Sequence, residues 1–392
     1  MNKNLWLLIL SQIFAFTAAP VTVFLSGIIG NKFTPIKSLA TLPMALSIVG
    51  IAIFAIFAAK IMSIIGRRLG FILASIGSSV ASLIAAFSII IESFIFFNLG
   101  CFLLGAAVAF SHQYRFAAVE TVNKEMAPKA ISIILLAGVG SAFIGPNLAN
   151  ISKELISNHL YAGSYIVLAI LTFCSTIFLF FYKDNHKSNA IYKKTTRTYF
   201  ELLSNPRFLQ ALIASAFAYA VMSFLMTATP ISMHVMEKIN LTKTGFVIQT
   251  HIAAMFLPSL ITGNLIKKYG HSKIMYTGVV LFSVTIITSL FDQNFINYLI
   301  ALIFLGFGWN FLFISGTSLL VLNYKEEEKY KAQGLNDFIV YTVHATGSLS
   351  AGILIILTNW KIMNIICIPL LAIIILTILR ADLHNKRFTN KN

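Results

Sequence analysis

Charge is scarce in this sequence. Asp, Glu, Lys and Arg make up 11% of the 392 residues, whereas a soluble globular protein has about 25% charged residues. Hydrophobic residues, by contrast, account for 58% of the chain. The polar side chains are too few to cover a soluble fold of this length. The composition therefore excludes an ordinary soluble protein and predicts an integral membrane protein.

Cysteine is also scarce, and its positions indicate no chemistry. Cys101, Cys174 and Cys367 all lie in apolar runs, are odd in number and lack metal-ligand spacing. We interpret them as packing residues. The sequence also lacks the clustered carboxylates, His-rich metal motif or activated nucleophile of a membrane-embedded enzyme. We expect neither enzymatic activity nor a bound cofactor.

Positive charge is present, with a formal net charge of +16, but its distribution does not indicate a nucleic-acid partner. The basic residues lie in short loops between apolar runs and not on one amphipathic face. If the N-terminus is cytoplasmic, 22 of the 29 Lys and Arg lie in both termini and alternate loops, and six lie on the opposite face. Those alternate loops are 60–68, 123–129, 183–207, 267–273 and 323–331. This asymmetry predicts a multi-pass protein of the cytoplasmic (inner) membrane with both termini in the cytoplasm.

Apolar runs long enough to cross a bilayer occur twelve times. A hydrocarbon core of roughly 30 Å requires about 20 apolar residues per helical crossing. Runs this long and continuous are helices and not barrel strands, because backbone groups in lipid must be satisfied within the segment. We predict an all-α integral membrane fold of twelve transmembrane helices. The runs are 5–29, 39–62, 69–91, 94–120, 130–151, 161–182, 208–233, 245–266, 274–291, 295–322, 332–357 and 362–379.

The longest connection, 183–207, is polar and basic and separates six runs from six. Each half carries a glycine with basic residues after its second run, and Gly66 and Gly270 lie 204 residues apart. Lys129 and Lys331, each followed by Ala, lie 202 residues apart. Two similar offsets indicate duplicated halves, as in transporters that work by alternating access. We predict an N-terminal six-helix bundle at 1–182, a cytoplasmic linker at 183–207 and a C-terminal six-helix bundle at 208–392.

These repeated turns resemble the signature of the major facilitator superfamily, which reads roughly Gly-x-x-x-Asp-Arg-x-Gly-Arg-Arg between its second and third helices. The first copy keeps Gly66-Arg67-Arg68, with Ala59 in place of the family glycine and Ser63 in place of the family aspartate. The second copy keeps Gly263, Lys268, Gly270 and Lys273 in register. The resemblance covers the whole chain and implies the major facilitator fold of two six-helix pseudo-repeats. It also implies secondary active transport of a small organic solute.

Longer stretches resemble a bacterial branch of the superfamily that includes riboflavin permeases. They are 112–118 with 129–132, and 308–313 with 333–338. This resemblance implies uptake of riboflavin or a flavin-like solute. Gly145-Pro146 supports an alternative, because it is similar to the Gly-Pro motif of drug/proton antiporters that export hydrophobic compounds.

Residues for solute binding follow from the helices that line the central cavity in this superfamily, namely the first, fourth, seventh and tenth. Arg115 is costly within a membrane span, and His112 lies three residues before it on the same helical face. From the other half we expect an aromatic surface for a flat heteroaromatic solute, with plain packing as the alternative. The full set predicted to bind the solute is Gln12, His112, Tyr114, Arg115, Tyr219, Trp309, Asn310 and Phe313.

Gating residues are predicted from the same resemblance, in which loop arginines pair with acidic groups at cytoplasmic helix ends. Arg67 and Arg68 supply the cations, and Glu120 and Asp337 are the nearest carboxylates. Each carboxylate has another possible role: Glu120 can pair with Lys124, and Asp337 suits a helix N-terminus.

Coupling to a proton or cation is left open, with His112, His344 and Glu120 as the titratable candidates. The expected partners are the solute, the lipid bilayer and such an ion. We expect a monomer.

Overall fold

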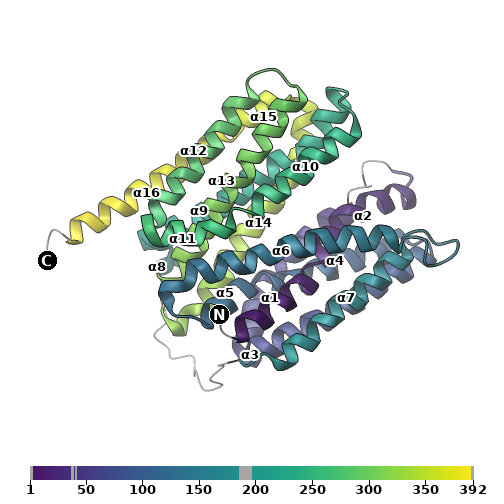
Figure 1. The fold of residues 1–392 in the computed structure, drawn as a ribbon, viewed down its shortest axis with the longest axis horizontal. Coiled ribbons are helices and arrows are strands. Elements are labelled where there is room, and N and C mark those ends of the chain that lie inside the picture. The colour runs from purple at the N-terminus through teal and green to yellow at the C-terminus, as the bar shows by residue number, and fades with distance from the viewer. Residues whose placement is uncertain (1–2, 37–38, 40–41, 185–196, 390–392) are drawn as a thin grey trace. The chain divides into compact units, whose positions relative to one another are not determined.

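The protein is helical throughout the part of the chain that the computed structural model describes, residues 3–36, 39, 42–184 and 197–389 (Figure 1). Those residues contain no strand. The helices are α1 (Lys3–Ala15), α2 (Ala18–Phe33), α3 (Leu42–Ile90), α4 (Phe94–Ser111), α5 (Tyr114–Glu120), α6 (Ala127–Ile151), α7 (Ala162–Phe181), α8 (Tyr199–Ser204), α9 (Pro206–Pro230), α10 (Leu241–Phe256), α11 (Ser259–Tyr269), α12 (His271–Ser289), α13 (Phe295–Val321), α14 (Lys329–Leu357), α15 (Trp360–Ile366) and α16 (Ile368–Thr389).

Eleven helical segments of the described chain are long and apolar enough to cross a membrane. One of them, Leu42–Ile90, is long enough for two crossings and contains Gly66 with φ 85° and ψ 164°. A positive φ is a conformation that only glycine adopts without strain, so the helix turns there. Divided at Gly66, the segments account for the twelve predicted crossings, and the all-α membrane fold is confirmed.

Several crossings contain a helix break inside a continuous apolar run, where hydropathy does not change. The first is divided between α1 and α2 at Phe16 and Thr17, where the Thr17 hydroxyl donates to the Phe14 carbonyl at 2.5 Å. The fourth is divided between α4 and α5 at His112 and Gln113. Local hydrogen bonding by a side chain such as that of Thr17 competes with the helical pattern. The predicted runs 5–29 and 94–120 are therefore each two helices.

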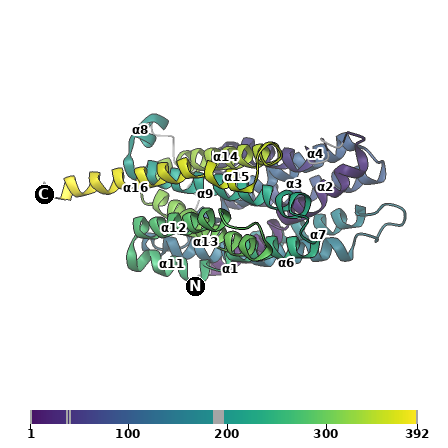
Figure 2. The same cartoon turned by 90° about the horizontal axis from the view of Figure 1, so that it is seen from above.

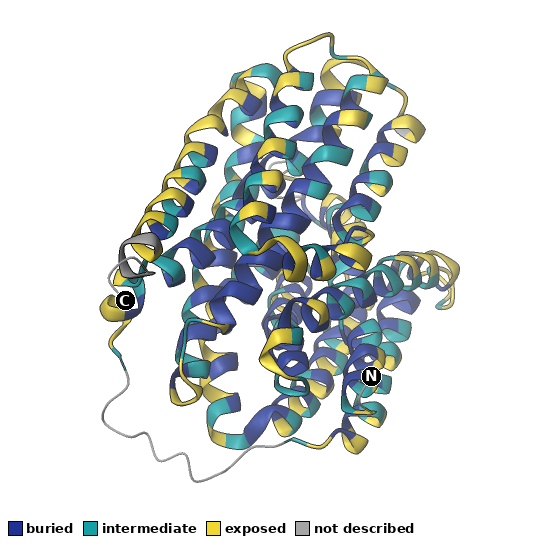
Figure 3. Ribbon diagram, turned by 60° about the vertical axis from the view of Figure 1, so that its left-hand side comes forward, coloured by how far each residue is buried: buried dark blue, intermediate teal, exposed yellow. Residues whose placement is uncertain are grey.

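The exposed sides of these helices are apolar. Figure 3 shows buried and exposed residues on different sides of most helices. Large apolar side chains such as Ile95, Phe180 and Ile356 are exposed by 65% or more. Side chains of this kind are compatible with lipid and not with water.

The chain separates into two compact units. The first comprises 1–123, 133–193 and 333–338, and the second comprises 124–132, 194–332 and 339–392. Helix α14 therefore contributes six residues to the first unit and all of its other residues to the second. The predicted bundle boundary stays a prediction, because 185–196 of the predicted linker lie outside the described residues.

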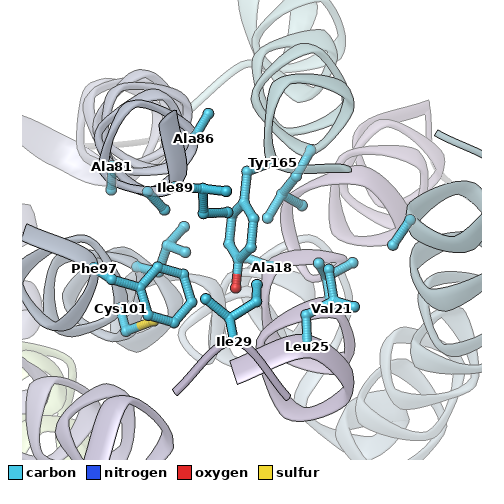
Figure 4. Packing of buried hydrophobic residues seen from close by; sticks show 14 of the residues in the cluster. Ala18, Val21, Leu25, Ile29, Ala81, Ala86, Ile89, Phe97, Cys101 and Tyr165 are labelled. Atoms are coloured by element: carbon cyan, nitrogen blue, oxygen red, sulfur yellow. The ribbon is translucent and has the colours of Figure 1, made fainter. Parts of the chain in front are cut away.

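Each unit is held together by helices that pack against one another. In the first unit α3 packs against α4 and α7, and α1 packs against α7. In its core, apolar residues of α2 and α3 lie around the ring of Tyr165, with Phe97 and Cys101 of α4 alongside (Figure 4). In the second unit α13 packs against α9, α10 and α12 (Figure 2).

Burial differs among the spans. The four most buried are the first, fourth, seventh and tenth crossings, with 50%, 67%, 83% and 72% of their apolar windows buried. These are the crossings that the family resemblance assigns to the cavity lining, and they carry most of the predicted solute-binding residues.

Candidate functional site

A network of charged and amide side chains occupies one end of the first unit. Arg67 follows the Gly66 turn and is fully buried. Its guanidinium donates to Glu120 Oε1 at 2.8 Å, to Gln113 Oε1 at 3.0 Å and to Gln333 Oε1 at 2.5 Å. The predicted cation and one predicted carboxylate are thus brought together.

Asp337 is the second carboxylate of this network. It is fully buried, and Arg115 forms a salt bridge with its Oδ1. Gln113 Nε2 donates to Asp337 Oδ2 at 2.6 Å, and Asn336 Nδ2 donates to Oδ1 at 2.9 Å. Gln113 therefore joins the two ion pairs into one network, with two positive and two negative charges.

Hydrogen bonds from neighbouring amide side chains explain how these charges are tolerated. A buried ion pair recovers its desolvation cost only when further hydrogen bonds satisfy the remaining donors and acceptors. Three amide side chains supply those bonds here. On α14, Gln333, Asn336 and Asp337 follow helical i, i+3 and i+4 spacing, so one face of the helix presents all three. The three amides were not predicted as site residues, although Gln113, Gln333 and Asn336 lie in the segments that carry the branch resemblance.

Arg68 lies apart from this network. Its backbone N–H donates to Asp184 at 3.2 Å, and its guanidinium donates to the Phe180 carbonyl and lies over the Phe180 ring. The two loop arginines therefore have different surroundings. Arg67 contacts a predicted gating carboxylate, and Arg68 contacts the end of α7.

Five ring side chains form an aromatic cluster in the second unit. Tyr219 of α9 lies at its centre, with Trp309 edge-on at 5.2 Å and His344 stacked at 5.1 Å between ring centroids. Phe313 stacks on Trp309 at 5.0 Å, and Tyr341 meets Tyr219 edge-on at 5.5 Å. These separations are those at which aromatic rings attract one another. We call Tyr219, Trp309, Phe313, Tyr341 and His344 the aromatic cluster.

Two polar atoms of the aromatic cluster are buried without a hydrogen-bond partner, Trp309 Nε1 and His344 Nδ1. Buried polar atoms are usually paired, because leaving one unpaired costs free energy. The predicted binding residues Tyr219, Trp309 and Phe313 are thus brought together with His344, which was predicted only for coupling. Tyr341 was not predicted, because one more aromatic residue in an aromatic-rich chain gives no distinct signal.

The amide of Asn310 is held by neighbouring helices and not by the aromatic cluster. Its Nδ2 donates to the Met255 carbonyl at 2.7 Å and to Ser259 Oγ at 2.8 Å, and its Oδ1 accepts from Thr262 at 2.6 Å. In this arrangement Asn310 joins α13 to α10 and α11.

The remaining predicted residues lie in the first unit. Tyr114 stacks on Phe71 of α3 at 4.1 Å. His112 meets Phe16 edge-on at 5.4 Å. Gln12 of α1 is 5% exposed, and its Oε1 is buried without a partner. The solute-binding roles of these residues stay predictions.

The start of α14 is fastened to the end of the central loop. Arg197 donates to both carboxylate oxygens of Glu328, at 3.0 Å from Nε and 2.6 Å from a terminal nitrogen, and to the Asn323 carbonyl at 3.0 Å. The hydrogen bond to Glu328 raises the pKa of Arg197 above its ordinary value. Lys331 also donates to the Arg197 carbonyl, at 2.5 Å. These contacts hold the helix that carries Gln333 and Asp337.

Comparisons with known proteins agree with this architecture. The sequence model described as Major Facilitator Superfamily matches residues 5–258 and 226–392. The riboflavin transporter RfnT of Brucella anthropi is 34% identical over 381 residues, which cover 96% of this chain and 95% of that protein. YddS of Bacillus subtilis, an uncharacterised transporter of the same superfamily type, is 27% identical over 93% of this chain and 87% of its own length.

Solved structures share the fold at low sequence identity. The human organic anion transporter MFSD10 matches with a TM-score of 0.72 at 12% identity, covering 96% of this chain and 99% of its own. FucP, solved in the outward conformation, matches with a TM-score of 0.71 at 15% identity, covering 95% and 97%.

Proposed function

Because this chain belongs to the Major Facilitator Superfamily, we propose that it imports riboflavin or a closely related flavin by alternating access. The observation that carries the proposal is the 34% identity with a riboflavin transporter over nearly the full length of both chains. The chain acts as a monomer in the cytoplasmic membrane, with both termini in the cytoplasm.

The aromatic cluster suits the ring system of such a solute. A flavin ring is flat, uncharged and heteroaromatic, and it carries carbonyl and ring nitrogen atoms along its edge. Aromatic faces bind such a ring by stacking. Trp309 Nε1 and His344 Nδ1, which lack partners, supply polar contacts to the ring edge.

The polar chain of the solute is assigned to the first unit. Gln12 offers an unpartnered Oε1 for a hydroxyl group, and His112 offers ring nitrogens. Arg115 binds Asp337 in this structure, so it contacts the solute only in a state in which Asp337 has released it.

The charged network acts as a gate. Helix α14 gives Gln333–Phe338 to the first unit and its later residues to the second. If α14 moves as one helix with the second half during rocking, Arg67 must release Gln333 and Arg115 must release Asp337. The cytoplasmic side of the transporter is closed while these bonds are intact, and it opens once they break.

Transport by whole cells tests the proposal. A riboflavin auxotroph carrying the protein should grow at low external riboflavin and accumulate labelled riboflavin faster than vector-only cells. A protonophore added during uptake tests coupling to a proton, for which His112, His344 and Glu120 are the candidates. Uptake no faster than in vector-only cells contradicts the proposal.

Export of hydrophobic compounds is the competing function, supported by Gly145-Pro146. The structure offers another reason for the glycine, because a Cβ at Gly145 would lie 3.1 Å from Val21 and 3.3 Å from the Thr17 carbonyl. Efflux from preloaded cells, without uptake, favours the exporter.

A further inference from the structure

The turn at Gly270 repeats the turn at Gly66 in backbone but not in contacts. Gly66 has φ 85° and ψ 164°, and Gly270 has φ 85° and ψ 160°. The residue after Gly66 is Arg67, which binds Glu120. The residue after Gly270 is His271, whose Nε2 is buried without a partner. The same turn thus carries a satisfied cation in one unit and an unsatisfied imidazole in the other.

The partner carboxylate of the first unit has no counterpart in the second. Glu120 is the last residue of α5, where the fourth crossing ends. The last residue of α13, where the tenth crossing ends, is the apolar Val321. The repeat therefore keeps the turn in both units, but the crossing that meets the turn ends in an anionic side chain only in the first.

A pocket of about 430 Å³ opens at the second turn. Its lining includes Arg207, Tyr269, His271, Lys273, Leu319 and Asp382. Arg207 and Asp382 neutralise each other through a 2.8 Å bond. Lys273 is exposed, and its side chain forms none of the ion pairs found in the described residues. The lining therefore carries a net positive charge beside one unused imidazole nitrogen.

We propose that this pocket binds the phosphate group of an anionic phospholipid. Lys273 supplies charge, and His271, in the neutral tautomer that carries its hydrogen on Nε2, donates a hydrogen bond to a phosphate oxygen. Leu319 and the exposed Tyr269 offer apolar surface to the glycerol and the first acyl carbons. The pocket lies where the spans Thr242–Tyr269 and His271–Ser289 meet, at a membrane surface rich in lysine. Basic pockets between transmembrane helices at this surface bind lipid headgroups. The lipid phosphate thus occupies the place that Glu120 takes in the first unit.

Lipid binding to purified full-length protein in a neutral detergent tests this site. Short-chain phosphatidylglycerol is titrated and the bound fraction is followed by native mass spectrometry. Lys273→Gln should bind about fivefold more weakly, the size expected for one lysine near an anionic headgroup. Lys273→Arg should bind like the parent, and His271→Phe should weaken binding. Lys267→Gln is the matched control, an exposed lysine of the same turn outside the pocket lining, and should stay within twofold of the parent.

Two further arms identify the ligand. Short-chain phosphatidylcholine should bind equally to the parent and to Lys273→Gln, because its headgroup has no net charge. Inorganic phosphate should displace phosphatidylglycerol only at far higher concentration. Equal phosphatidylglycerol affinity of the parent and Lys273→Gln overturns the site. Displacement by inorganic phosphate at concentrations equal to the lipid overturns the lipid assignment.

Discussion

Arg115 shows at the scale of one residue how a charge is kept within a membrane span. An arginine at a helix centre costs about 2.5–3.5 kcal/mol on insertion scales. Here the guanidinium is 2% exposed and bound to Asp337, whose other oxygen accepts from Gln113. The charge of Arg115 is therefore neutralised inside the protein by Asp337, and the charge of Asp337 is neutralised by Arg115.

Loss of both partners should cost less stability than the sum of the two single losses. Arg115→Gln or Asp337→Asn leaves an unpaired buried charge, which costs about 3–5 kcal/mol in soluble proteins. Arg115→Leu with Asp337→Leu should lose less stability than the two single leucine variants summed. Thermal unfolding in detergent measures this, with the exposed Lys124→Gln as a control expected to show no change. Additive losses contradict a coupled pair.

Arg115 also allows a test of solute binding. If the guanidinium contacts the solute once Asp337 releases it, then Arg115→Lys should impair uptake as well as Arg115→Ala, because lysine lacks the planar set of donors. Surface expression is checked in parallel. Parental uptake rates in both variants rule out a role for Arg115 in binding.

Trp309 distinguishes stacking on the solute from packing. The Trp309 side chain packs on the rings of Phe313 and Tyr219, and the residue is 1% exposed. If it supports the bound ring, Trp309→Phe should raise the KM for uptake by roughly two- to tenfold, as expected for one aromatic contact, and Trp309→Ala should raise it further. Trp360→Phe is the control, because Trp360 is as deeply buried but packs on Tyr298. Equal loss in both Trp309 variants indicates packing.

Helix α14 is the element on which the proposed gate depends. Its residues Gln333 and Asp337 bind Arg67 and Arg115, and Gly334 lies so close to α3 that a Cβ there would be 2.9 Å from Ala59 Cβ. The helix is thus both bonded and closely packed at this segment. Weakening the bonds should favour the state in which the segment has been released.

Neutralising the gate should shift the transporter inward. Arg67→Gln and Asp337→Asn should each reduce periplasmic labelling of a reporter cysteine at Ser348 on α14, by the few-fold that a coupling of about 0.5–3 kcal/mol allows. The double variant should be less than additive. Arg68→Gln is the matched control, because Arg68 contacts α7 and not this network. Labelling that matches the parent in every variant excludes the gate.

Orientation in the membrane is a property of the whole molecule. The basic loops predict that both termini and the turn at Lys267 lie in the cytoplasm, and that the loop around Ser157 lies on the other side. In a variant whose native cysteines are replaced, an impermeant maleimide should label Ser157→Cys in intact cells. It should label Lys267→Cys only after permeabilisation. The reverse pattern overturns the predicted topology.

The number and type of the helices were predictable from sequence because hydropathy reports directly what lipid requires of a segment. The turns at Gly66 and Gly270 were predictable as well, since glycine marks a backbone that other residues avoid. The breaks at Phe16 and His112 were not, because hydropathy does not change along the runs in which they lie.

The charged residues of the candidate site could be identified from the sequence, because an ionisable residue within a membrane span is costly and is seldom without a role. Which partners they take was decided only by the tertiary structure. Arg67 and Arg68 are neighbours with the same chemistry, yet one meets Glu120 and the other meets Phe180. Adjacent residues on a helix point in different directions, and the side chains they meet come from distant parts of the chain. The sequence by itself therefore determined the fold and the charged residues, and the packing of helices determined the pairs.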